Sequence, residues 1–304
     1  MLVSFSDALS RAWQHAKKML FQPFDPGKWM ILGFSAWLAR LLSWGSSGGG
    51  GTDFNTGGGD WHPGDLNAFF NETWAWMLEH LWLVALLSVL LITVVTLVVV
   101  LTWISSRGKF IFLDNVLRDQ AEVVEPWKRF RRLGNSLFSF RLVFGLTQLL
   151  ACLGIVTWGL GWAYASPDGW SSILYPLIGL AVFLFVLMAG MGLISFFLDA
   201  FVVPIMHRRE ITVWQAWSVF GGLLASHPGV FVLCTLLLVA LSIAVCVALF
   251  MIGFLTCCVG WLLLAIPYIG TVLILPILVT YRYFTADILA QLDPELALGS
   301  ESRG

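Results

Sequence analysis

The chain has 304 residues, of which 59% are hydrophobic and only 12% are charged. Soluble globular domains carry about 45–50% apolar and about 25% charged residues, so this composition excludes an ordinary water-soluble globule. The formal net charge of −1 combines 17 basic and 18 acidic groups, and their placement along the chain is more informative than their sum. The composition predicts an all-α integral membrane protein, with one transmembrane domain over residues 1–304.

Residues 4–20 are predicted to form an amphipathic helix that lies in the plane of the membrane interface. Lys17 and Lys18 on its polar face are expected to contact anionic headgroups. The apolar face is predicted to consist of Phe5, Leu9, Trp13, Ala16 and Leu20.

The first membrane helix is predicted over residues 29–44 and contains Arg40, the only basic residue inside a predicted span. One interpretation places the Arg40 guanidinium in a polar cavity or beside an acidic partner. The favoured alternative is that its long stem carries the charge to the outer headgroups, because Arg40 lies within about one turn of the outer end.

Residues 45–80 form an acidic segment that begins with a glycine-rich tract and contains no Lys or Arg. Because basic residues accumulate in cytoplasmic loops, we expect this segment to be a flexible outer loop. His62 between Asp60 and Asp65 could suggest a weak metal site, but the glycine tract offers no rigid ligand frame. A solvated acidic loop is therefore favoured.

Leu81 to Ile104 contains no charge over 24 residues. As a helix it would be about 36 Å long, enough to cross a hydrocarbon core of about 30 Å. The most basic part of the chain follows at residues 107–141, so this end is predicted to face the cytoplasm.

Residues 110–124 are expected to leave the membrane as a helix, and residues 126–138 to form a second amphipathic helix. Basic residues near anionic lipid contribute about 1 kcal/mol each, so this segment is predicted to bind headgroups of the cytoplasmic leaflet rather than nucleic acid. Its basic residues are Lys128, Arg129, Arg131 and Arg132.

A third amphipathic helix, capped by Thr212, is expected at residues 213–229, and residues 291–304 are expected to form a flexible tail. Pro267 and Pro276 predict kinks in the last span. The remaining spans are predicted over residues 142–164, 173–197, 229–252 and 261–281.

The predicted outer loops contain no Lys or Arg, so we expect six transmembrane helices with both termini in the cytoplasm. The expected location is the inner membrane of the cell. A unit of amphipathic helix, outward span and inward span recurs three times, over about residues 4–118, 125–206 and 211–290. Each unit enters and leaves on the same side, which predicts three parallel hairpins around an axis along the membrane normal.

Three sequence segments carry a resemblance to a known group of proteins: FQPFDPGKWMILGFSAWL at residues 21–38, the FLD exits at 112–114 and 197–199, and PYIGTVLILPILVTYRYF at 267–284. The chain resembles uncharacterised prokaryotic six-helix membrane proteins. More distantly, it is similar to the membrane domain that precedes some glycerophosphoryl diester phosphodiesterases. The soluble phosphodiesterase domain has no counterpart in this sequence, so the resemblance implies neither an enzymatic activity nor a substrate.

Asp114, Asp199 and Asp287 occupy equivalent positions in the three repeats, separated by 85 and 88 residues. They could form an acidic ring at the mouth of a pore or cavity. The favoured alternative is that each carboxylate pairs locally with a basic residue and fixes the angle between a membrane helix and an in-plane helix. The candidate partners are Lys109, Arg118, Arg208, Arg209 and Arg282.

Polar residues inside the predicted spans are sparse. Gln148 could line a pathway, although an interhelical hydrogen bond is the favoured explanation. The five cysteines fall in apolar spans without a CxxC pattern, and no Ser, His and Asp or Cys and His arrangement suggests covalent catalysis. The sequence therefore predicts no enzyme, no metal site and no cofactor.

Two functions remain open at this point. The favoured one is a non-enzymatic membrane scaffold whose in-plane helices organise membrane lipids or protein partners of unknown identity. The alternative is a small transporter or channel for a lipid-like or small solute. Energised transporters usually have ionisable groups or broken helices near the middle of the membrane, and here only the prolines of the last span qualify.

Overall fold

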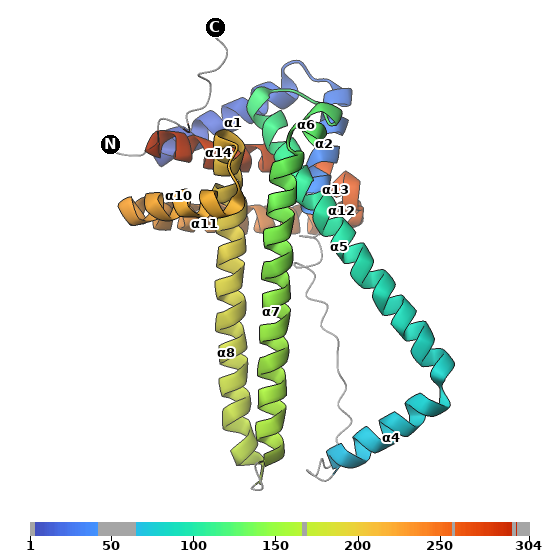
Figure 1. Ribbon diagram of the computed structural model, residues 1–304. Helices are drawn as coiled ribbons and strands as arrows, with labels where there is room; N and C mark the ends of the chain where they lie inside the picture. The colour runs from blue at the N-terminus through green and yellow to red at the C-terminus, as the bar shows by residue number, and fades with distance from the viewer. Residues whose placement is uncertain (1–3, 42–64, 166–168, 257–258, 294–295, 297–304) are drawn as a thin grey trace. The chain divides into compact units, whose positions relative to one another are not determined.

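The computed structural model describes residues 4–41, 65–165, 169–256, 259–293 and 296. Within these residues the regular elements are helices and no strand occurs (Figure 1), which confirms the all-α prediction. The chain divides into two units, described separately below. Unit 1 comprises residues 1–41, 103–140 and 196–304, and unit 2 comprises residues 42–102 and 141–195.

The helices differ widely in length (Figure 1). A short π-helical segment, η1, connects two of them. In chain order they are α1 (Phe5–Phe21), α2 (Pro26–Arg40), α4 (Asp65–Glu79), α5 (Leu81–Arg118), α6 (Val124–Arg129), α7 (Arg131–Ala165), α8 (Gly169–Phe197), η1 (Leu198–Val202), α9 (Val203–Arg209), α10 (Val213–Ser226), α11 (Pro228–Leu255), α12 (Val259–Ala265), α13 (Pro267–Leu273) and α14 (Leu275–Leu292).

Four stretches of helix are long and apolar enough to cross a membrane, and they coincide with the second to fifth predicted spans. They are Leu81–Arg118, Arg131–Gly159, Ile178–Arg209 and Pro228–Leu255. In the most apolar window of each of the first three, no residue is buried inside the protein. Continuous apolar surface of this extent needs an apolar medium, so the four helices are compatible with a membrane protein.

The first and sixth predicted spans correspond to shorter helices. α2 contains 15 residues and is about 22 Å long, and the next described residues after Leu41 begin at Asp65, so the predicted glycine-rich tract and His62 lie outside the described residues. The sixth span is divided among α12, α13 and α14. Pro267 and Pro276 stand in the first turns of α13 and α14, where proline is tolerated because those N–H groups lack helical partners. The predicted kinks are therefore helix breaks.

The predicted helix at residues 4–20 is confirmed as α1, and its buried face overlaps the predicted apolar face at Ala16 and Leu20. Ser4 caps its first turn by accepting a hydrogen bond from the Asp7 backbone N–H. Trp13, predicted on the apolar face, is 53% exposed. α1 packs along α14, and small side chains allow that close approach. The buried residues of α1 are Ala8, Ala12, Ala16, Met19 and Leu20.

The basic segment is helical, as the sequence predicts, but its helices are continuous with the membrane spans on either side. α5 continues without a break through residues 105–118, until Asp119 adopts a left-handed conformation with φ of 56°. The predicted amphipathic helix at 126–138 is divided between α6 and the first turns of α7, which then runs directly into the third apolar stretch. The helix expected at residues 110–124 is therefore a continuation of the second span to Arg118, and the third span is a continuation of the basic segment.

The core of unit 1 lies around the last turns of α5 and is rich in aromatic side chains. Phe201 packs against Phe220 and Phe231, with ring centroids 5.8 and 5.2 Å apart. A second apolar cluster joins α1, α2 and α14. These contacts hold segments from both ends of the chain around residues 105–116 of α5.

In unit 2, α7 and α8 form an antiparallel hairpin (Figure 1). A Cβ atom added at Gly159 would lie 2.7 Å from Leu180 Cδ2. The absence of a side chain at Gly159 therefore allows the two helices to approach closely, as small residues do in membrane helix pairs.

Candidate functional site

The burial of α5 changes along its length. Its apolar residues before Leu101 are mostly exposed, whereas residues 105–116 are all buried. The buried part includes Arg107, Lys109 and Asp114, which are 7%, 5% and 4% exposed. Because burying a charge is costly unless it is paired or hydrogen-bonded, the partners of these groups define the candidate site.

Asp114 accepts two interactions through Oδ1. Arg118 Nε lies 3.0 Å away, one turn along the same helix. His207 Nε2 of α9 also lies 3.0 Å away, and both the Asp114 and His207 side chains are less than 10% exposed. Asp114 thus connects the end of α5 to α9.

Asp199 lies in η1, and its carboxylate forms an ion pair with Lys109 of α5. Its backbone carbonyl accepts a hydrogen bond of 2.5 Å from Arg282 Nη1 of α14. In η1 the N–H of Val203 donates to the carbonyl of Leu198 five residues earlier, the spacing of a π-helix. η1 is therefore held by basic side chains from two other helices.

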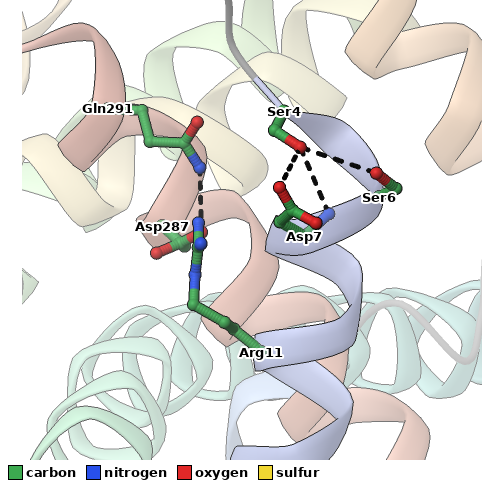
Figure 2. A network of polar contacts seen from close by, with 6 residues as sticks. All are labelled: Ser4, Ser6, Asp7, Arg11, Asp287 and Gln291. Carbon is green, nitrogen blue, oxygen red and sulfur yellow. Dashed lines mark hydrogen bonds and ion pairs between the residues drawn. The ribbon is translucent and has the colours of Figure 1, made fainter.

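Asp287 of α14 pairs with the first helix of the chain (Figure 2). Arg11 Nη2 donates to its Oδ2 at 2.6 Å, and Gln291 Nε2 donates to the same atom at 3.0 Å. This hydrogen bond from Arg11 to Asp287 raises the pKa of the Arg11 guanidinium. Nearby, Tyr283 stacks on His15 with ring centroids 4.2 Å apart, and burial raises the pKa of the Tyr283 hydroxyl.

Further polar contacts fix α2 beside the last turns of α5. Lys28 at the start of α2 pairs with Asp119 at 2.8 Å, and the Ser105 hydroxyl donates to the Ala39 carbonyl at 3.0 Å near the end of α2. Arg40 follows, half-buried and within electrostatic range of Arg282. This places Arg40 near the basic end of α5; whether it snorkels or faces a cavity stays a prediction.

The six residues predicted to contact anionic lipid are all exposed in unit 1. One of them, Arg129, forms an ion pair of 3.5 Å with Glu210. Their exposure leaves them accessible to headgroups, although contact with lipid itself stays a prediction. The other five are Lys17, Lys18, Lys128, Arg131 and Arg132.

In unit 2, Gln148 of α7 donates through Nε2 to the Met188 sulfur of α8 at 3.2 Å. This contact crosses the hairpin between the two helices, which is the arrangement that the interhelical alternative requires. Gln148 remains exposed.

Comparison with known proteins gives one match, which covers nearly all of these residues. The model of a family of unknown function, DUF7544, matches residues 3–298. The chain belongs to this family. No curated protein and no solved structure matches the chain significantly, and no link to glycerophosphoryl diester phosphodiesterases emerges.

Some residues of this DUF7544 site were missed by sequence reasoning. The pairing of Asp287 with Arg11 joins residues 276 positions apart, and no local pattern signals it. His207 and Asp114 are 93 positions apart, and no local pattern connects them either. The only pair visible in the sequence is Asp114 with Arg118, because residues four apart share a helix face.

Proposed function

We propose that this protein is a non-enzymatic integral membrane scaffold that organises anionic lipids or protein partners at the inner face of the membrane. The observation that carries the proposal is the change in burial along α5, which exposes apolar residues in its first part and buries charged residues in its last turns. The exposed apolar residues before Leu101 are suited to contact with lipid, and the buried residues 105–116 are suited to a packed, ion-paired part of the protein.

The proposed topology is six membrane crossings in three parallel repeats, with both termini in the cytoplasm. The charge pairs support packing of the three repeats against one another, because the partners come from different repeats. Lys109 of the first repeat pairs with Asp199 of the second, and Arg11 of the first pairs with Asp287 of the third. The packing of α1 along α14 joins the first repeat to the last.

The same contacts favour structural pairs over an acidic ring. Asp199 and Asp287 each pair with a basic residue on another helix, and Asp114 pairs with Arg118 of its own helix beside His207 of α9. A carboxylate that is engaged in this way contributes little negative potential to attract a cation. A scaffold needs such fixed helix ends, because its partners must meet a surface of constant shape.

A second candidate function is transport of a lipid-like or small solute. Two observations favour it: Asp199 lies in a π-helical segment, and α12, α13 and α14 are separated by breaks. π-helical segments occur frequently at functional sites, and broken helices form the binding sites of many transporters.

Reconstitution into liposomes of phosphatidylethanolamine and phosphatidylglycerol separates the two functions. We expect leakage of an encapsulated dye, proton flux and scrambling of a fluorescent lipid to match those of protein-free liposomes. Flux well above that background would contradict the scaffold and support transport.

A further inference from the structure

Arg107 is the buried cation of α5 that the ion pairs described above do not explain. Its side chain is 7% exposed, and no carboxylate lies within ion-pair distance of it among the residues that the structure describes. Its Nε atom is buried without a hydrogen-bond partner. A buried guanidinium in this condition lacks a counter-charge, which an anionic ligand would supply.

The surroundings of Arg107 hold its guanidinium in one place. The guanidinium carbon lies 4.2 Å from the centre of the Trp103 ring and 5.3 Å from that of Trp127. On the other side, a Cβ atom added at Gly134 would lie 2.6 Å from Arg107 Cγ. Stacking on aromatic rings and close backbone packing together fix the position of the charge.

Asn135 connects this buried charge to the surface. Its Oδ1 accepts hydrogen bonds from Arg107 Nη2 at 3.0 Å and from Trp103 Nε1 at 3.3 Å. Asn135 is itself exposed, and with its oxygen engaged, the amide NH₂ group is the part that remains available to a ligand. The two hydrogen bonds to Oδ1 therefore fix the orientation of the Asn135 amide and leave its NH₂ group to donate to a ligand.

A second positive charge lies next to this donor. Arg131 precedes Asn135 by four residues on α7, so both share one face of the helix. Arg131 is exposed and acts electrostatically on Arg107. Two arginines and an oriented amide donor match the charge and hydrogen-bonding needs of a phosphate group.

We propose that Arg131, Asn135 and Arg107 form a binding site for one phosphate group, supplied by a phospholipid headgroup or by free phosphate. Arg131 and the Asn135 amide contact the phosphate oxygens, and Arg107 supplies the compensating charge behind them. The lipid source rests on the proposed membrane function, because tryptophans such as Trp103 and Trp127 favour the headgroup layer. The phosphate chemistry does not depend on it.

Native mass spectrometry of the full-length protein in an uncharged detergent tests the site. We expect one phosphatidylglycerol to bind more tightly than phosphatidylcholine. Asn135→Ala, which leaves the net charge unchanged, is expected to weaken that binding about tenfold, as loss of a hydrogen bond to a charged group does. Arg131→Gln should weaken it at least as much. Arg132→Gln removes an equal charge from the exposed headgroup-contacting surface but lies outside this site, so it should weaken the binding less.

A parallel titration with inorganic phosphate, against chloride at equal ionic strength, distinguishes the source. Displacement of phosphatidylglycerol by phosphate, or a rise in melting temperature that Asn135→Ala abolishes, supports a site that also takes free phosphate. Binding of the lipid alone supports the headgroup as the source. Asn135→Asp preserves side-chain volume and places a carboxylate beside Arg107, so it should abolish binding in both arms.

Equal losses in Arg131→Gln and Arg132→Gln, with no effect of the Asn135 substitutions in either arm, would overturn the proposal in favour of diffuse surface charge. This outcome is independent of the liposome experiment. Flux from liposomes would contradict the scaffold function but would not bear on phosphate binding. Absence of phosphate binding would not change the interpretation of the flux measurement.

Discussion

Lys109 has a side chain that is 6% exposed, and its partner Asp199 is 42% exposed. Replacing Asp199 by Asn removes the carboxylate that pairs with this buried ammonium group. Loss of one partner of a buried pair costs about 3–5 kcal/mol, and solvent screening at Asp199 reduces this to about 2–3 kcal/mol. We expect Asp199→Asn to lower the melting temperature of the detergent-solubilised protein clearly, as measured by circular dichroism.

The pair of Arg129 with Glu210 provides the control, because the two side chains are 42% and 64% exposed. Glu210→Gln should cost less than about 1 kcal/mol, the usual range for surface pairs. Equal shifts in melting temperature for both variants would show that the Lys109 pair is not buried in solution.

The contact between α2 and α5 depends on the missing side chain of Gly108. A Cβ atom at this position would lie 2.7 Å from the Ala39 nitrogen and from the Leu38 carbonyl carbon, which are backbone atoms that cannot rotate away. Gly108→Ala must therefore push α2 off α5, with an expected destabilisation of about 1–3 kcal/mol.

Gly145 of α7 is the matched control, since a Cβ atom there would have nothing within 4 Å. Gly145→Ala should stabilise the helix by about 0.5–1 kcal/mol, because alanine loses less backbone entropy than glycine. Opposite shifts in melting temperature for the two variants are the expected result. A stabilising effect of Gly108→Ala would contradict the close packing of α2 on α5.

Basic residues occupy one side of the predicted topology, and the acidic segment before α5 occupies the other. In a variant without the five native cysteines, we expect Gly57→Cys to react with a membrane-impermeant maleimide in intact cells. Ser10→Cys on α1 should react only after the membrane is permeabilised. Labelling of residue 57 only in permeabilised cells would invert the topology and refute the assignment of residues 45–80 to the outside.

Much of the helical architecture follows from the sequence alone. Leu81 to Ile104 must be helical in lipid, because an apolar medium offers no other partner to its backbone N–H and C=O groups. The prolines at 267 and 276 mark helix breaks for an equally local reason, the missing N–H and the clash with the preceding turn. The pair of Asp114 with Arg118 follows from helical spacing.

The pairs of charged and hydrogen-bonded residues that are far apart in the sequence were decided only by the tertiary structure. Nothing local connects Arg11 to Asp287 or His207 to Asp114, because which helices meet depends on how whole helix faces pack. α1 shows the same limit: its amphipathic pattern placed Trp13 on the apolar face, and packing on α14 additionally buries Ala8 and Ala12, which that pattern did not include. Periodicity identifies a helix and its candidate faces, but the neighbouring helix determines which face is buried and which charges are paired.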